Sequence, residues 1–163
     1  MIFRKAEFKD TDRIMEIYEI ARRFMVEAGN PNQWIDGYPK RELIEDDITK
    51  GHFYVSEGKD DCIVHGVFAF ILGDDPTYAV IEGGQWLNDE PYGTIHRMAN
   101  DCTIRGLLEN SLPFCFTMTG NVRIDTHADN FPMQRAIARQ GFTECGIIYV
   151  DDGSARKAYQ LKK

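Results

Sequence analysis

Apolar residues recur every three to four positions along residues 14–28, which is the spacing of one face of an α-helix. The pattern comprises Ile14, Ile17, Tyr18, Ala21, Phe24, Met25 and Ala28. Asp10 or Thr11 can cap such a helix, and Gly29 is typical of the residue that ends one. The pattern therefore predicts an amphipathic helix that directly follows a short strand at residues 2–6.

Alternating or continuous apolar stretches predict strands along the rest of the chain. Residues 52–57 and 62–72 flank the turn-forming residues 58–61, so they are expected to form an antiparallel hairpin. The other expected strands are residues 93–99, 122–126, 143–150 and 156–161, with residues 78–82 as a candidate for one more. Residues 151–154 are expected to form the turn of a second hairpin.

Three further helices are predicted between these strands. They cover residues 40–50, residues 103–112, where Pro113 should end or kink the helix, and residues 132–140, which Asn130 can cap. Strands of both orientations are needed to connect this order of elements. The sequence therefore predicts an α/β fold with a mixed sheet.

The length and composition favour one globular domain that spans residues 1–163. Apolar residues make up 43% and charged residues 28%, and the net charge is -7. The acidic balance argues against general nucleic-acid binding, which needs a basic surface. The longest apolar run, Val67 to Leu72, is far shorter than a membrane span, and residues 1–10 do not resemble a secretory signal. We therefore expect a cytoplasmic protein.

The four cysteines are Cys62, Cys102, Cys115 and Cys145, and no two of them form a C-x-x-C pair. Their spacing predicts neither a zinc site nor a small disulfide framework. We expect them to be reduced and mostly buried, in keeping with a cytoplasmic location, and we expect no bound metal.

The most specific motif lies near the C-terminal end, where Asn130 precedes Gly141 and Phe142 by eleven and twelve residues. With the order of elements, this spacing resembles the GNAT superfamily of acyl-CoA-dependent N-acyltransferases over nearly the whole chain. The stretches GNPNQWIDGYP, WLNDEPYGTIHRMA, RIDTHADN and GIIYVDDGSARKAYQ resemble a bacterial subgroup of acetyltransferases. The resemblance implies one N-acetyltransferase domain with a mixed sheet of six to seven strands flanked by helices.

The same resemblance implies a function. A GNAT protein transfers an acetyl group from acetyl-CoA, the acyl-donor co-substrate, to a primary amine of a small molecule by direct attack. It implies no metal, and homodimers are common in the family. Two alternatives stay open: a non-catalytic acyl-CoA-binding or metabolite-sensing module on the same fold, and a protein that has lost the cofactor site and binds another metabolite.

The resemblance assigns cofactor binding to the end of one strand, to the loop after it and to a helix cap. These residues are Met98, Ala99, Asn100, Thr103, Ile104, Arg105, Gly106, Leu107, Leu108 and Asn130. Backbone N–H groups at a helix N-terminus would bind the pyrophosphate. Two residues depart from the family pattern: Leu108 replaces a small residue and is expected to crowd the phosphates, and Ile137 replaces the tyrosine that protonates the leaving thiolate.

The chemistry needs a base that deprotonates the attacking amine, directly or through water. The candidates are Glu82, His96 and His127, and each can instead have a purely structural role. Aromatic residues in loop-like segments often line acceptor pockets, so Trp34, Tyr38, Trp86 and Tyr92 are candidates for substrate binding, with core packing as the alternative.

Overall fold

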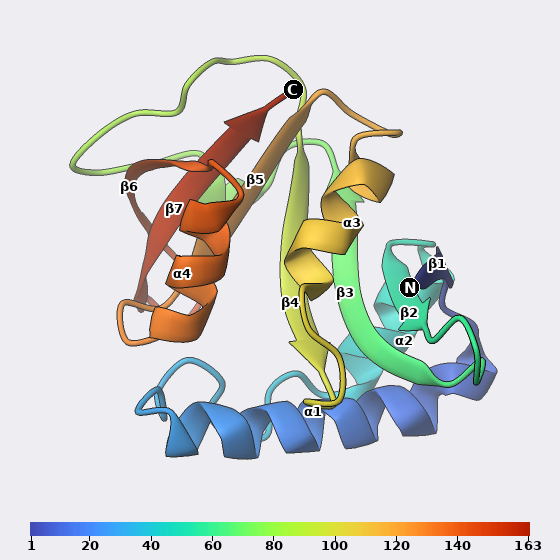
Figure 1. Ribbon diagram of the computed structural model, residues 1–163. Coiled ribbons are helices and arrows are strands. Elements are labelled where there is room, and N and C mark those ends of the chain that lie inside the picture. Colours follow the sequence, from blue (N-terminus) through green and yellow to red (C-terminus); the bar gives the residue numbers. More distant parts are fainter.

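The computed structural model describes residues 1–163, which form a seven-stranded sheet covered by helices on both faces (Figure 1). The strands are β1 Ile2–Lys5, β2 Phe53–Glu57, β3 Val64–Leu72, β4 Gly93–Asn100, β5 Asn121–Thr126, β6 Thr143–Tyr149 and β7 Ala155–Lys162. The helices are α1 Thr11–Glu27, α2 Arg41–Thr49, α3 Leu107–Cys115 and α4 Phe131–Arg139, with short 3-10 turns η1 Phe8–Asp10 and η2 Pro76–Tyr78.

The strands lie in the order β1-β2-β3-β4-β5-β7-β6, and neighbouring strands are antiparallel except for β4 and β5. The parallel pair arises because α3 connects the end of β4 to the start of β5 on the same side of the sheet (Figure 1). The predicted α/β fold with a mixed sheet is therefore confirmed, as are both predicted hairpins.

Alternation along β3 divides the core between the two faces of the sheet. Val67 and Ala69 pack with Ile14 and the other buried residues of α1 and α2. Phe68 and Phe70 point the other way and pack with the buried residues of α3 and α4. The helical periodicity of the first 28 residues therefore identified the buried face of α1 correctly.

Two predicted elements differ from the structure. The helix predicted at residues 103–112 begins at Leu107, because Gly106 adopts a left-handed conformation (φ 72°) that keeps the residues before it out of the helix. It continues to Cys115 with Pro113 in its last turn, where only one helical hydrogen bond is lost. The candidate strand at residues 78–82 is absent: η2 ends at Tyr78, and Glu82 forms only a single bridge with Ile147.

All four cysteines are free, but only Cys115 and Cys145 are buried. Cys62 and Cys102 are exposed in loops, so the expectation that most of the cysteines are buried is wrong. Both exposed cysteines have positive φ angles, which are characteristic of turns rather than of buried strands. None of the helices has the length and apolar character that a transmembrane span requires.

Candidate active site

The parallel strands β4 and β5 separate after a short ladder. Pairing between them covers only three residue pairs and ends at Ile95 and Ile124. Directly after this ladder, β4 has an irregularity opposite Phe68, where Arg97 has a φ of 53°. The Tyr18 hydroxyl donates a hydrogen bond of 2.7 Å to the Arg97 carbonyl and supports the bulged backbone. The carboxyl ends of the two strands therefore diverge and leave unpaired backbone between them.

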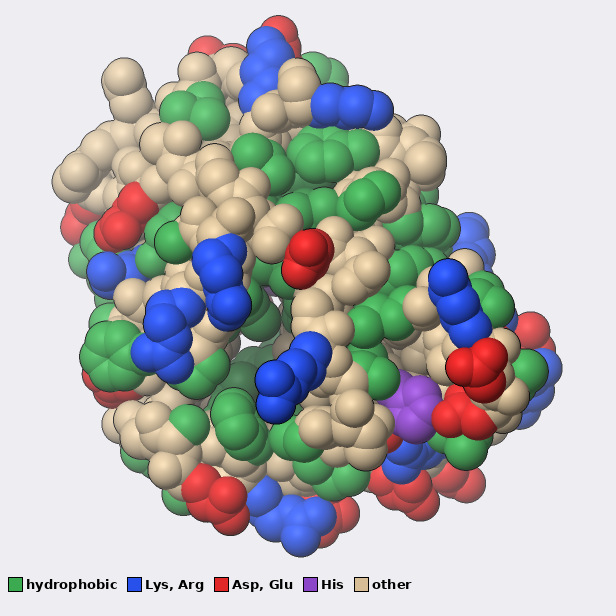
Figure 2. Space-filling model, viewed as in Figure 1, with side chains coloured by type: hydrophobic (Ala, Val, Ile, Leu, Met, Phe, Trp, Pro, Cys, Tyr) green, Lys and Arg blue, Asp and Glu red, His purple; other side chains and the backbone are tan.

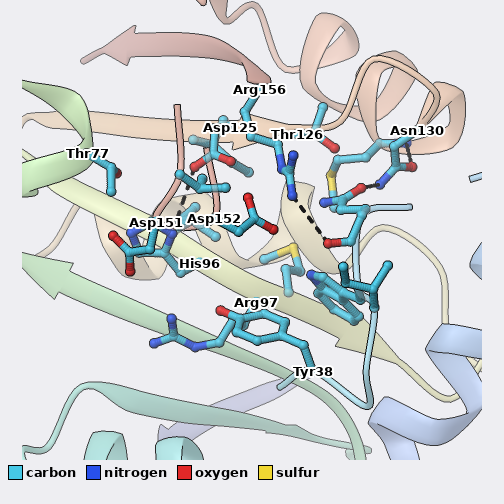
Figure 3. A pocket seen from close by; sticks show the side chains of 18 of the residues that line it. Tyr38, Thr77, His96, Arg97, Asp125, Thr126, Asn130, Asp151, Asp152 and Arg156 are labelled. Carbon is cyan, nitrogen blue, oxygen red and sulfur yellow. Dashed lines mark hydrogen bonds and ion pairs between the residues drawn. The ribbon is translucent and has the colours of Figure 1, made fainter. Parts of the chain in front are cut away.

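A cleft of about 580 Å³ opens at this divergence. Its walls come from the loop between α1 and α2, the diverging parts of β4 and β5, the start of α4 and the turn between β6 and β7 (Figure 3). Figure 2 shows a hollow in the same region of the molecule, with Lys and Arg side chains around it. Clefts of this volume typically bind small molecules.

His96 lies on the wall of the cleft between two carboxylates (Figure 3). Its Nε2 is 2.7 Å from Asp75 Oδ2, and its Nδ1 is 3.9 Å from Asp125 Oδ2. The Tyr78 hydroxyl donates a hydrogen bond of 2.6 Å to the same Asp125 oxygen. The imidazole is therefore held in one orientation by a carboxylate, the arrangement that positions a general base.

Hydrogen bonds keep Asp75 ionised. Burial alone would raise the pKa of Asp75, but hydrogen bonds from His96 and from the Thr77 hydroxyl and N–H lower it to about 2. An ionised Asp75 accepts a hydrogen bond from His96 Nε2–H, which leaves the lone pair on Nδ1. The nitrogen available to take a proton is therefore Nδ1.

The lowered pKa of Asp75 predicts a contribution to stability that depends on pH. The folded-state pKa lies below the unfolded value, so the contribution is complete above pH ~4 and is lost as the pH falls towards ~2. As the pH falls through this range, the free energy of unfolding of the parent decreases. We expect this decrease to be smaller by about 1 kcal/mol in Asp75→Asn, measured by urea unfolding. The exposed neighbour variant Asp74→Asn should retain the parent's slope. A parent-like slope for Asp75→Asn would contradict the assignment.

The other two candidate bases lie outside the cleft. Glu82 is exposed, not half-buried, and accepts a hydrogen bond of 2.9 Å from the Tyr149 hydroxyl. His127 follows β5, and its Nδ1 accepts a hydrogen bond of 3.1 Å from the Asp129 N–H. The structure therefore brings only His96 of the three into the cleft.

The four candidate aromatic residues divide into two pairs. Trp34 and Tyr38 line the cleft from the loop between α1 and α2. Trp86 and Tyr92 instead enclose the Arg123 guanidinium, which lies 4.0 Å and 3.8 Å from their ring centroids. Trp86 and Tyr92 therefore do not line this cleft, and their contacts are those of a packed structural cluster.

The loop before α3 exposes its backbone to solvent, together with some of its side chains. Thr103, Arg105 and Gly106 are exposed, and no side chain caps the first N–H groups of α3. The Thr103 N–H and hydroxyl both donate to Asp101 Oδ1, which fixes the start of the loop. Such uncapped N–H groups fit the phosphates of a CoA molecule.

Leu107 and Leu108 do not crowd this loop. Their side chains point into the core between the sheet and α3, and Leu108 is only 4% exposed. The expectation that Leu108 blocks the phosphates is therefore wrong, because the helix begins at Leu107 and directs both side chains inward. Of the strand residues assigned to the cofactor, Met98 lines the cleft, Ala99 packs under α1, and Asn100 Oδ1 accepts a hydrogen bond from the Cys102 N–H.

Asn130 both caps α4 and lines the cleft. Its Oδ1 accepts a hydrogen bond of 3.2 Å from the Met133 N–H, and its Nδ2 donates to Gln33 Oε1 at 2.9 Å. Gln33 thereby ties the loop between α1 and α2 to the start of α4. Ile137, further along α4, is fully buried, so no side chain reaches the cleft from that position.

Sequence reasoning missed several polar residues of the cleft. Asp75, Asp125, Gln33 and Arg156 line it, as does Thr126, whose buried Oγ1 has no hydrogen-bond partner. Asp125 lies on the predicted strand at residues 122–126, but nothing in the sequence related Asp75 to His96. The structure contains no group of three His, Cys, Asp or Glu side chains arranged to hold a metal ion.

Comparison with solved structures gives many similar folds, and no protein-family profile and no curated protein matches the chain. A GNAT-family acetyltransferase from Streptococcus agalactiae is 34% identical, with a TM-score of 0.88 over 99% of this chain and 95% of that one. A Staphylococcus aureus structure is 24% identical, with a TM-score of 0.70 over 99% of both chains. A GNAT-family acetyltransferase from Listeria monocytogenes is 19% identical, with a TM-score of 0.72 over 99% of this chain and 94% of that one. The identity and coverage of the first of these structures show that this chain belongs to the GNAT family of acetyltransferases.

Proposed function

We propose that this chain transfers an acetyl group from acetyl-CoA to the primary amine of a small molecule by direct attack. The observation that carries the proposal is His96 in a cleft at the divergence of β4 and β5, oriented by Asp75. The volume of the cleft suits a small-molecule acceptor. The single domain, the cytoplasmic location and the homodimer remain predictions from the sequence.

His96 would act as the general base. The amine nitrogen forms a bond to the thioester carbonyl carbon, the carbon–sulfur bond breaks, and the proton lost by the amine passes to His96 Nδ1, directly or through water. Asp75 holds the opposite nitrogen and so fixes the orientation of the ring, with Nδ1 on the side of Asp125. When bound, acetyl-CoA supplies the thioester carbonyl, and the products are the N-acetylated amine and CoA.

Three features would hold acetyl-CoA. The uncapped start of α3 would bind the pyrophosphate, and the unpaired backbone of β4 beyond Ile95 would bind the pantetheine arm. Arg105, in the loop directly before α3, is exposed and forms no ion pair, so it is free to attract the phosphates. The wholly buried Ile137 favours one other function, a non-catalytic acyl-CoA-binding module, because it removes the usual thiolate-protonating side chain.

Calorimetric titration with acetyl-CoA tests the part that both functions share. We expect a dissociation constant of micromolar order, which corresponds to a binding free energy of about -8 kcal/mol. Gly106→Ala should weaken binding about tenfold, because a Cβ at this position forces the backbone from a φ of 72° and so moves the loop. Gly83→Ala is a matched control, since Gly83 has a φ of 70° in a loop outside the cleft.

Release of CoA in the presence of small amines then separates the two functions. Turnover supports the transferase, whereas binding without turnover of any amine supports the binding module. No binding at millimolar acetyl-CoA would exclude both, and equal affinity of the parent and Gly106→Ala would show that this loop does not bind the phosphates.

A further inference from the structure

Arg156 is a buried cation in the wall of the cleft. It is the second residue of β7, pairs with Ile148 of β6 and follows the turn between these strands. Its side chain is directed towards the loop between α1 and α2 (Figure 3), and the residue is only 6% exposed. The mechanism described above does not use it.

The partners of Arg156 are all neutral. Its Nη1 donates to Ser154 Oγ at 2.8 Å and to the Ala155 carbonyl at 2.9 Å, and its Nη2 donates to the Gln33 carbonyl at 3.3 Å. A guanidinium has five N–H donors, so Nε–H and one Nη2–H are without a partner. These two groups can form one edge of the guanidinium, which matches the two oxygens of a carboxylate.

Other buried arginines of the chain have their charge stabilised. Arg97 forms an ion pair with Asp47, and Arg123 lies between two aromatic rings. Arg156 has neither a carboxylate within ion-pair distance nor an aromatic ring against it. Hydrogen bonds from Ser154 and the nearby charge of Arg156 lower the pKa of Asp152, but the two side chains form no ion pair. A buried charge without a paired counter-charge is costly, and an anionic ligand in the cleft would reduce that cost.

Most of the other charged side chains that line the cleft are carboxylates, beside the exposed Lys40 and the ion-paired Arg97. Five aspartates contribute to it: Asp36, Asp75, Asp125, Asp151 and Asp152. Asp75 and Asp125 flank His96, the residue proposed to receive the proton of the amine. Arg156 of β7 and His96 of β4 both line this cleft (Figure 3). The cleft thus offers one unpaired buried cation among anions, which is complementary to a ligand that carries both charges.

We propose that the acetyl acceptor is a zwitterionic amine whose carboxylate binds to Arg156 while its amino group faces His96. This chemistry is that of a free amino acid. The inference rests on the proposed transferase function, which it narrows to one class of substrate. Arg156 would then act in substrate binding and specificity, not in proton transfer.

Matched acceptors test this proposal with the full-length chain. Each free amino acid is compared with its carboxamide and its decarboxylated amine, with acetyl-CoA at saturation and CoA release as the readout. We expect kcat/KM for at least one amino acid to exceed that for both analogues by about 10²-fold, mainly through KM, since a charged, bidentate contact is lost in the analogues. Equal or better turnover of the analogues would overturn the proposal.

Variants of Arg156 show whether this residue causes the preference. Arg156→Gln should remove the preference for the amino acid over its two analogues. Arg156→Lys keeps the charge but not the planar pair of N–H donors, so it should retain a part of the preference. Lys157→Gln is the control, because Lys157 is next to Arg156 on β7 and pairs with Glu144 outside the cleft. An unchanged preference in a folded Arg156→Gln or Arg156→Lys variant would overturn the proposal.

Calorimetric binding of the same compounds in the presence of CoA separates this inference from the proposed function. If amino acids bind to the parent but not to Arg156→Gln, and no CoA is released from acetyl-CoA, the transferase function fails while the carboxylate site stands. If simple amines are acetylated and no amino acid binds, the transferase function stands and the carboxylate site fails. If no compound binds or reacts, the carboxylate site is overturned as well.

Discussion

Replacing His96 with glutamine is expected to lower kcat for acetyl transfer by about 10²–10⁴-fold, the usual contribution of a general base. Glutamine preserves a polar side chain that can bond to Asp75, but it has no basic nitrogen. The substrate KM should change little, because the proposed carboxylate and acetyl-CoA contacts come from other residues. Steady-state CoA release at several pH values measures the effect and shows whether the pH profile of kcat depends on His96.

His127→Gln is the matched control for this experiment, since His127 lies outside the cleft and contacts its own helix-capping turn. It should keep the parent's rate and pH profile. If His96→Gln retained the parent's kcat and profile, then His96 would not be the base, and the proton would leave through another group or through bulk water.

Leu108→Ala is expected to lower the free energy of unfolding by about 2–5 kcal/mol, because it removes a buried side chain and leaves a cavity. Leu108 packs in the core between the sheet and α3. Acetyl-CoA affinity should stay within about threefold of the parent, because the backbone N–H groups of α3 persist. Urea unfolding and calorimetry measure the two effects. Leu72→Ala at an exposed position should cost less than about 1 kcal/mol.

Together these measurements distinguish a core leucine from a loop leucine that obstructs the cofactor. Tighter acetyl-CoA binding by Leu108→Ala, with little loss of stability, would restore the original expectation that the side chain crowds the phosphates. The structure argues against that outcome, because Gly106 is the left-handed N-cap and the helix begins at Leu107, with the Leu108 side chain in the core.

The fold was largely predictable because local patterns determine most of its elements. The periodicity around Ile14 and Ile17 predicted α1, and Asn130 marked the start of α4. The errors lie where backbone conformation overrides helical propensity, as at Gly106, and in residues 73–91. There a long connection packs by tertiary contacts, such as the Trp86–Arg123–Tyr92 stack, that no local pattern indicates.

The site was only partly predictable because its residues are distant in the sequence. His96, Trp34, Tyr38 and Asn130 were identified as candidates from their residue types and from the family resemblance, and all four line the cleft. Asp75 lies 21 residues from His96, and nothing between them predicts the contact. In the sequence, nothing distinguishes Arg156 from other strand residues. In the structure, the turn before β7 and the loop that carries Gln33 enclose its side chain. Such contacts depend on the assembled sheet.

The short ladder between β4 and β5 also bears on the order in which the protein folds. The strands β1 to β4 and the strands β5 to β7 form two sets, each hydrogen-bonded within itself, that meet through only three residue pairs. Closing that junction brings together distant parts of the chain and costs loop-closure entropy. We therefore expect the junction to form late in folding. Asn130 and Arg156, which follow β5 in the chain, donate hydrogen bonds to Gln33 in the loop between α1 and α2, which precedes β2. Their loss should therefore accelerate unfolding more than it slows refolding, so these contacts lengthen the lifetime of the assembled cleft.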